Sequence, residues 1–278
     1  MKLTVQNQIP KAVPIKKIIQ ENPYVKTFVF EYKLGAKPGQ FANLWIPRVD
    51  EKPMSIAYDN GKEFWVSMFA VGPFSKKMHQ LKVGDMVGVR GPYGNAFSFK
   101  KGQHLVMMAG GYGVAPLYFL TLTAVKQGCT VDFVCGARSK DFLLYLNRIK
   151  KIKNVKLHVA TDDGSVGIRG YNTTILEKLV LETKGKGAKR KKIACVYACG
   201  PEMMMKRISD VCFEEKLDAQ LSVERYMKCG FGVCGQCTID PTGERTCMEG
   251  PVMSNEHVRK LTEFGKYHRD SIGKLHNF

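Results

Sequence analysis

The sequence lacks any long apolar run. Hydrophobic residues make up 44% of its 278 residues, yet no stretch approaches the roughly 18–20 consecutive apolar residues that cross a bilayer. We therefore expect no membrane span. The first ten residues, MKLTVQNQIP, also lack the apolar core of a secretory signal peptide. Together these absences predict a cytoplasmic protein.

The chain also lacks the signatures of common nucleic-acid-binding modules. Its formal net charge is +18, and its densest basic stretch is KGKGAKRKK at residues 184–192. No helix-turn-helix, aromatic RNA-binding signature or zinc-finger spacing accompanies that stretch. A basic surface suits an acidic partner or a phosphate-rich cofactor equally well. We therefore expect no nucleic-acid partner and interpret residues 184–192 as a solvated loop.

A disulfide framework is not expected, because such frameworks belong to small exported domains. Five of the nine cysteines are scattered, and most of them stand inside apolar runs such as VDFVCGA and IACVYACG. All but Cys199 are interpreted as small core residues. The five are Cys129, Cys135, Cys195, Cys199 and Cys212.

The other four cysteines gather near the C-terminus, in MKCGFGVCGQC and RTCMEGPV. They are Cys229, Cys234, Cys237 and Cys247, separated by four, two and nine residues. Structural zinc prefers two C-x₂-C pairs, and the second pair is missing here. The plant-type iron–sulfur spacing is C-x₄-C-x₂-C with a fourth cysteine further on. The spacing predicts a [2Fe-2S] cluster on these four cysteines, with zinc and free thiols as the alternatives.

Glycines between the cysteines support the same prediction. Gly230, Gly232 and Gly235 suit a loop that needs positive φ angles and must turn backbone N–H groups toward sulfur. An iron–sulfur cluster passes one electron at a time. Another group must therefore exchange electrons with it.

The secondary-structure pattern changes near residue 103. Residues 1–102 hold short β-rich stretches separated by glycine, proline and asparagine, which is typical of an antiparallel barrel or sandwich. Residues 103–223 alternate apolar strands with helices, which indicates a parallel α/β sheet. We predict an α+β multidomain protein with an N-terminal antiparallel β-barrel (1–102), a central α/β nucleotide-binding domain (103–223) and a C-terminal [2Fe-2S] segment and tail (224–278).

Two motifs in the α/β half suit a nucleotide. GGYGVAPL, at residues 110–117, follows a strand and opens a helix, where glycines allow close backbone approach and the helix N-terminus favours phosphate. Pro116 stands where the last glycine of G-x-G-x-x-G would be, so an ordinary strand–helix turn is the alternative. YACGPEMM brings Cys199, Gly200 and Pro201 to the end of a second strand. Because parallel strands share one carboxyl edge, both motifs should face the same crevice.

In the first half, AVGPFSKKM indicates the start of a helix. Ser75 is expected to cap this helix, with Lys76 and Lys77 in the first turn. The two lysines would suit a pyrophosphate. A solvated helix start is the alternative.

In order along the chain, KPMS, GPYGNAF, GGYGVAPL, TDDGSVG, ACGPEMM and ERYMKCGFGVCGQC resemble the electron transfer subunits of heterodimeric-type dihydroorotate dehydrogenases. That family belongs to the ferredoxin reductase superfamily. The resemblance covers essentially the whole chain, and the cysteine segment with RTCMEGPV is its most specific part. It implies FAD in the barrel, a nicotinamide nucleotide in the middle domain, and a [2Fe-2S] segment that docks on a catalytic subunit carrying FMN.

The resemblance also assigns flavin-binding residues. The family's Arg-Pro-x-Ser motif falls on Lys52, Pro53, Met54 and Ser55. Lys52 keeps the positive charge of arginine but lacks its planar fork. Further flavin contacts are implied at Ser67, Met68 and Phe69, and at the pyrophosphate helix, where the family's Gly-Thr becomes Phe74 and Ser75.

For the nicotinamide nucleotide, the resemblance implies Gly110, Gly111, Gly113, Pro116, Gly200 and Pro201 as binding residues. It places Cys199 near the hydride path, as the catalytic residue. The choice between NAD and NADP stays open. Arg138, Ser139 and Lys140 would suit a 2′-phosphate, whereas Asp141 would repel one.

The implied activity is electron transfer in pyrimidine biosynthesis. Dihydroorotate would be oxidised at the FMN of the partner chain, and the electrons would pass singly through [2Fe-2S] to FAD and then as a hydride to NAD⁺. The assembly would be a heterotetramer with two copies of each subunit. The alternatives are an electron transfer subunit of a sulfur-reducing hydrogenase or sulfite reductase complex, and a zinc-bearing interaction module.

Overall fold

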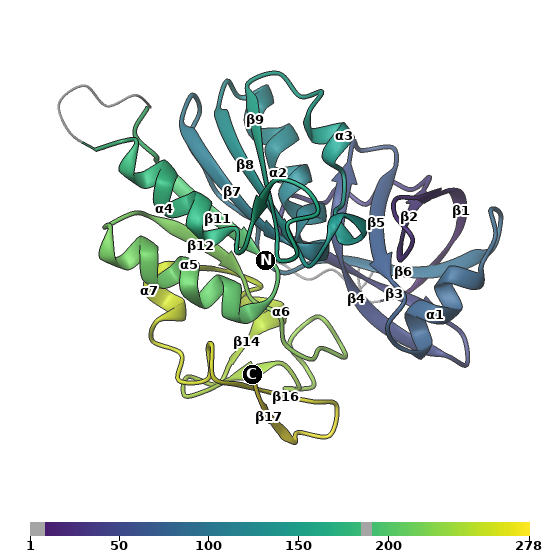
Figure 1. Cartoon of the computed structure of the whole chain (residues 1–278). Coiled ribbons are helices and arrows are strands. Elements are labelled where there is room, and N and C mark those ends of the chain that lie inside the picture. The colour runs from purple at the N-terminus through teal and green to yellow at the C-terminus, as the bar shows by residue number, and fades with distance from the viewer. Residues whose placement is uncertain (1–8, 185–190) are drawn as a thin grey trace.

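The computed structural model describes residues 9–184 and 191–278. Most of the basic stretch 184–192 therefore lies outside the described residues. Figure 1 shows a β-barrel on one side, a sheet with helices on both of its faces, and a C-terminal segment below that sheet. The predicted fold class is confirmed.

The N-terminal part is a closed barrel of six antiparallel strands in the order β1-β2-β5-β4-β3-β6. Alternating side chains fill its interior, and Phe28, Leu44 and Val66 are fully buried there, as the period of two along each strand requires. Helix α1 (Pro73–Gln80) closes one end with Phe74 and Met78. The strands are β1 (Lys11–Gln20), β2 (Val25–Phe30), β3 (Phe41–Ile46), β4 (Asp50–Asp59), β5 (Phe64–Phe69) and β6 (Met86–Tyr93).

The central part is built on a seven-stranded sheet in the order β10-β9-β8-β7-β11-β12-β15. All neighbours pair in parallel except β12 and β15. The central elements are β7 (His104–Gly110), η2 (Gly111–Gly113), α2 (Val114–Lys126), β8 (Thr130–Ala137), η3 (Lys140–Phe142), α3 (Leu146–Ile149), β9 (Val155–Thr161), β10 (Ile168–Arg169), α4 (Thr173–Leu181), β11 (Cys195–Cys199), α5 (Glu202–Glu214) and β12 (Ala219–Ser222).

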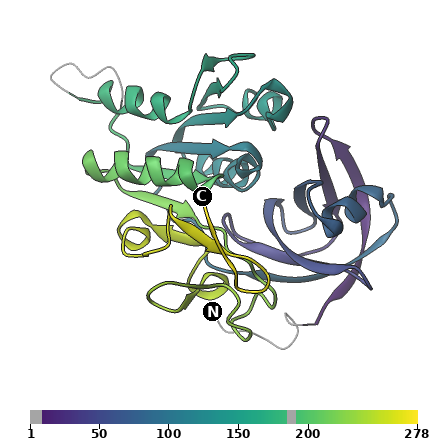
Figure 2. The ribbon, with the colours of Figure 1, turned by 60° about the horizontal axis from the view of Figure 1, so that its bottom comes forward.

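The two faces of this sheet have different neighbours. On β7, Leu105 and Met107 face the core under α2, which continues into the barrel at Val25. Val106 and Met108 face the opposite core, under α4 and α5. The sheet therefore separates the barrel side of the molecule from the side that α4 and α5 cover (Figure 2).

The C-terminal segment, predicted as residues 224–278, shares the second core with the central sheet. Strand β15 extends the sheet, and Ile239, Met253, Val258, Leu261 and Phe264 are buried with α4 and α5. Sequence periodicity could not show this, because three residues of strand carry no pattern. The segment consists of β13 (Thr238–Ile239), β14 (Glu244–Arg245), α6 (Thr246–Glu249), β15 (Val252–Ser254), α7 (Asn255–Val258), β16 (Tyr267–Arg269) and β17 (Leu275–Asn277).

A seam of polar side chains joins the barrel to the sheet. Tyr145 has a left-handed backbone (φ 60°), and its hydroxyl lies 2.5 Å from the Ser67 hydroxyl and 3.1 Å from that of Thr27. Nearby, Arg148 donates to Glu21 over 2.7 Å. Because Tyr145 is almost fully buried, this contact fixes the edge of β5 against the α/β domain.

No helix within the described ranges has the length and apolar character that a membrane-spanning helix needs. The longest helices, α2 and α5, have 13 residues each.

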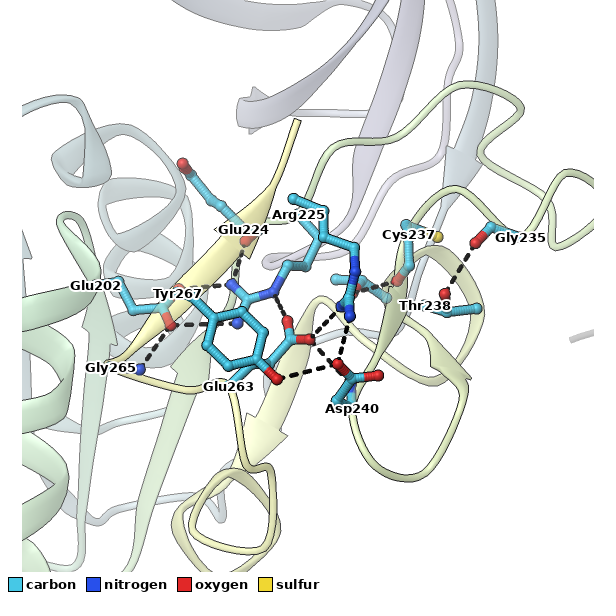
Figure 3. Close-up of polar contacts among 12 residues, drawn as sticks. Glu202, Glu224, Arg225, Gly235, Cys237, Thr238, Asp240, Glu263, Gly265 and Tyr267 are labelled. Atoms are coloured by element: carbon cyan, nitrogen blue, oxygen red, sulfur yellow. Dashed lines mark hydrogen bonds and ion pairs between the residues drawn. The ribbon is translucent and has the colours of Figure 1, made fainter. Parts of the chain in front are cut away.

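A buried arginine fastens the C-terminal segment to the sheet, as Figure 3 shows. The Arg225 guanidinium donates to Glu202, at the start of α5, over 2.5 and 3.2 Å, and also to Glu263. These three side chains are 6% exposed or less. Glu263 also accepts from the Asp240 N–H over 2.9 Å, three residues beyond Cys237. The network thus connects the helix after Gly200 and Pro201 with the cysteine segment.

Arg225→Leu should therefore cost about 3–5 kcal/mol of unfolding free energy, because it leaves the buried Glu202 carboxylate without its cation, whereas Glu263 keeps Arg269 over 3.2 Å. The matched control is Arg207→Leu, also on this side of the sheet, which breaks an exposed pair with Glu177 (2.5 Å) and should cost less than about 1 kcal/mol. Urea unfolding measures both values. Equal losses of unfolding free energy would show that the buried network stabilises the fold no more than an exposed ion pair does.

Candidate functional site

The four clustered cysteines lie together as two neighbouring pairs. The side chains of Cys229 and Cys234 are within hydrogen-bonding reach of each other, and so are those of Cys237 and Cys247. No group of three or more His, Cys, Asp or Glu side chains within the described residues would enclose a single metal ion. Two pairs of thiols instead suit a group with two irons, each of which takes two cysteines.

The backbone around Cys229 is arranged to stabilise a thiolate. Burial raises the pKa of Cys229, but hydrogen bonds from the N–H groups of Cys234, Phe231 and Val233 outweigh it and lower the pKa to about 7. Gly230, Gly232 and Gly235 have φ angles of 82°, 82° and 69°. These are the left-handed angles that the sequence predicts for a loop folded around sulfur. The donor set therefore fits [2Fe-2S].

The pairs differ in exposure. Cys237 and Cys247 are buried, Cys229 is half-buried and Cys234 is exposed. On the inner side of the loop, the Phe231 ring packs 5.3 Å from the Arg90 guanidinium and 6.2 Å from the Tyr93 ring, both on β6. One edge of the cysteine loop therefore rests on the barrel, and the other faces solvent.

The predicted flavin motif lies on β4, beside the cysteine segment. Lys52 donates to the Tyr226 hydroxyl over 3.0 Å and pairs with Asp50 over 2.8 Å. Ser55 is exposed, and within the described chain no side-chain hydrogen bond occupies its hydroxyl. Lys52 thus offers a cation, and Ser55 a free donor and acceptor, on a strand whose end packs against α2. These groups fit a phosphorylated flavin, and the assignment stays a prediction.

The second predicted flavin stretch is less accessible. The Ser67 hydroxyl is taken by Thr27 and Tyr145, Met68 is buried in the barrel, and the Phe69 ring lies 5.6 Å from that of Tyr24. Side-chain contacts of Ser67 and Met68 with a flavin would require these groups to rearrange.

Helix α1 differs from the expectation in its cap. Gly72 is the N-cap, and Ser75 is the third helical residue. The Ser75 hydroxyl accepts from the N–H groups of Val71 and Gly72 over 2.9 and 3.0 Å. Phe74 is buried in the barrel core. Since the sequence gives both Gly72 and Ser75 capping chemistry, the pattern alone could not choose between them.

The two nucleotide motifs meet at the carboxyl edge of the sheet, as predicted. A Cβ on Gly113 would lie 2.1 Å from the Cys199 carbonyl oxygen, and one on Gly200 would lie 2.8 Å from the Gly110 backbone. These glycines therefore allow the two turns to pack backbone against backbone. Gly111 (φ 54°) has open space at its Cβ position.

The remaining predicted nucleotide residues lie at the start of the two helices. Pro116 is in the first turn of α2 and Pro201 is the N-cap of α5. Both helix N-termini therefore belong to the edge where parallel sheets bind phosphate.

Cys199 lies at this edge beside two residues that the sequence analysis missed. Burial and the nearby Glu224 carboxylate raise the pKa of the Cys199 thiol, so it is protonated at neutral pH. The Tyr112 hydroxyl donates to Glu224 over 3.2 Å. The available signal was position: Tyr112 stands inside the glycine turn, and Glu224 lies two residues beyond the end of β12.

Comparisons with protein families agree with this arrangement. Residues 224–259 match the iron-sulfur cluster binding domain of dihydroorotate dehydrogenase B, and residues 107–210 match the oxidoreductase NAD-binding domain. The chain is 43% identical over 265 residues to a protein of Methanocaldococcus jannaschii, covering 95% of this chain and 97% of that one. It is 40% identical over 270 residues to one of Methanothermobacter thermautotrophicus, covering 96% and 97%. Both are named as probable dihydroorotate dehydrogenase B (NAD(+)), electron transfer subunit.

Solved structures show the same architecture. The chain is similar to a structure described under NADH-dependent reduced ferredoxin-NADP oxidoreductase, with a TM-score of 0.78 and 27% identity over 88% of this chain and 89% of the other. A ferredoxin reductase of carbazole 1,9a-dioxygenase shares the fold at a TM-score of 0.65 and 16% identity, covering 75% and 66%.

Replacing Cys234 with serine should remove or strongly perturb the red-brown chromophore, because a serine oxygen is a harder ligand than a thiolate for this iron site. Iron and sulfide analysis with visible and EPR spectra of anaerobically purified protein measures this. Scattered Cys212, replaced by serine, is the control and should leave the spectrum unchanged. Wild-type protein that holds zinc but no iron or sulfide would refute the cluster.

Replacing Lys52 with alanine should weaken FAD retention, whereas Lys52→Arg should preserve or improve it through bidentate contact. Tyr226→Phe removes the hydroxyl that Lys52 contacts but keeps the lysine, so it should retain FAD. The measurement is flavin released per protein after gel filtration. Equal FAD occupancy in all three variants and the wild type would show that Lys52 is not a ligand.

Proposed function

The chain belongs to the family of dihydroorotate dehydrogenase B electron transfer subunits, and we propose that it passes electrons from dihydroorotate, oxidised on a partner subunit, to NAD⁺. In the balanced reaction, dihydroorotate and NAD⁺ give orotate, NADH and a proton. The single observation that carries the proposal is the placement of the cysteine segment against β4, the barrel strand of the predicted flavin motif. Tyr226, three residues before Cys229, contacts Lys52 there.

Each part of the chain has a distinct task in this proposal. The four cysteines would hold [2Fe-2S], and the residues on β4 would hold FAD. When bound, the cluster supplies one-electron transfer and the flavin exchanges either one electron or two. The protonated Cys199 and the pair of Tyr112 with Glu224 would orient the nicotinamide at the carboxyl edge of the sheet.

The exposed edge of the cysteine loop supports docking on a partner. Val233 is 77% exposed and stands next to the exposed ligand Cys234. The nearby Phe231 packs on the barrel at Arg90 and Tyr93, so it does not share this exposed edge. We propose that Val233 and Cys234 face an FMN-containing catalytic subunit, in a heterotetramer with two copies of each chain.

The proposed function predicts a split activity. With FAD bound, the isolated chain should move electrons from NADH to an artificial dye, while dihydroorotate should reduce nothing until the FMN partner is added. Cys234→Ser should abolish dihydroorotate-dependent NAD⁺ reduction in the complex but leave much of the NADH-to-dye reaction. Removing residues after Glu224 is a poorer test, because it would strip Met253, Val258 and Phe264 from the α/β core.

Dihydroorotate oxidation by the isolated chain would contradict this division of labour. Coupled transfer that survives Cys234→Ser in a protein without iron would contradict it as well. Size-exclusion chromatography with light scattering on the complex tests the two-plus-two assembly.

A further inference from the structure

The geometry points to Asn43 as a positioning residue that fixes the Cys229 side of the cysteine loop against the strand of the flavin motif. This inference rests on the proposed function, since it assumes a cluster in the loop and a flavin on β4. It concerns a residue of the barrel that lies outside both of the predicted binding motifs.

Asn43 reaches the cysteine loop from within the barrel wall. Its side chain is fully buried, and its Nδ2 donates to the carbonyl of Lys228 over 3.1 Å and to that of Cys229 over 3.3 Å. These bonds join residues 185 and 186 positions apart in the chain. One barrel side chain therefore holds the backbone of a predicted iron ligand directly.

The same residue is placed next to the flavin motif. In the ladder between β3 and β4, Asn43 pairs with Pro53, and Ala42 pairs with Met54. On the other side, Asn43 pairs with Arg90 of β6, whose guanidinium lies over Phe231. The path from Cys229 to Pro53 thus consists of one hydrogen-bonded amide and one strand pairing.

The loop is shaped to receive this amide. Gly230 has a φ of 82°, and a Cβ there would lie 3.2 Å from both polar atoms of the Asn43 side chain and 3.0 Å from the Tyr93 ring. A side chain at position 230 would therefore press the loop away from the barrel. The glycine serves the close approach as well as the turn.

Asn43 lowers the folding stability in one respect. Its Oδ1 is buried and has no hydrogen-bond partner within the described part of the chain, which costs free energy. Exchanging the positions of Oδ1 and Nδ2 would place this oxygen against the carbonyl oxygens of Lys228 and Cys229. An apolar residue of similar size would avoid this penalty. The two hydrogen bonds that Nδ2 donates are therefore the role that asparagine fills at this position.

The test compares Asn43→Ala and Asn43→Asp with wild-type protein loaded with iron, sulfide and FAD. Asn43→Asp keeps the shape but removes both N–H donors. We expect either variant to change the EPR g-values and the midpoint potential of the cluster, and to slow bleaching of the cluster by NADH about tenfold, the lower range for an outer partner of a metal site. Reduction of a dye by NADH should stay within about twofold of wild type, because that reaction needs only the flavin.

Asn95 provides a matched control. It is also a barrel-side asparagine whose Nδ2 donates to two carbonyls of the C-terminal segment, Glu249 over 3.0 Å and Val252 over 2.7 Å, but among the described residues no hydrogen bond joins it to a cysteine or to β4. Asn95→Ala should lower the melting temperature and leave the EPR spectrum and the bleaching rate of the folded protein unchanged.

Two outcomes would overturn the inference. One is an unchanged EPR spectrum, potential and bleaching rate in Asn43→Ala that keeps its iron. The other is an equal change in Asn95→Ala, which would show a general loosening of the segment. If NADH fails to bleach the cluster even in the wild type, the proposed function fails instead, and the spectrum of Asn43→Ala still tests the contact with Cys229.

Discussion

The buried cation of Arg225 is the contact on which the relative placement of the nucleotide edge and the cysteine segment depends. It stands between Glu202, which follows the turn at Gly200 and Pro201, and Glu263, which holds the backbone of Asp240. A charged group at 3% exposure is tolerated only because carboxylates meet its donors on both sides. The geometry of each site is therefore tied to that of the other through this side chain, in addition to the pairing of β15 with β12.

The barrel also contacts both the α/β domain and the cysteine segment. Through Ser67 and Tyr145 it is fixed to the α/β domain, and through Asn43 and Lys52 it is fixed to the cysteine segment. Both sets of contacts come from neighbouring strands of one closed barrel. A movement of the barrel toward the α/β domain would therefore disturb its contacts with the cysteine segment. If β4 holds the flavin, as proposed, the flavin exchanges electrons with both the cluster and the nicotinamide, which is the order that the chemistry of the three cofactors requires.

Features encoded by local spacing could be predicted from the sequence. Alternating apolar strands and helices predicted the sheet, and C-x₄-C-x₂-C predicted a cysteine loop for a cluster, because both patterns reflect geometry within a few residues. The shared crevice of Gly113 and Cys199 followed from a general property of parallel strands.

What could not be predicted depends on contacts across the chain. The three residues of β15 gain their strand only from β12, and Tyr145 owes its place to Ser67 and Thr27, about 78 and 118 residues earlier. Only the fold brings Glu224 to Tyr112, 112 positions earlier in the chain. Competing local signals explain the cap of α1, where both Gly72 and Ser75 had suitable chemistry.

The pairing of β15 with β12 also decides how the protein can deliver electrons. Some redox proteins carry their metal group on a tethered domain that swings between donor and acceptor. Here the chain that follows the cysteines returns into the central sheet and is buried under α4 and α5, so the cysteine loop is anchored to the α/β core at its C-terminal end. In the proposed function, the distance that an electron crosses to reach the cysteine loop then depends on how the whole subunit docks on its partner.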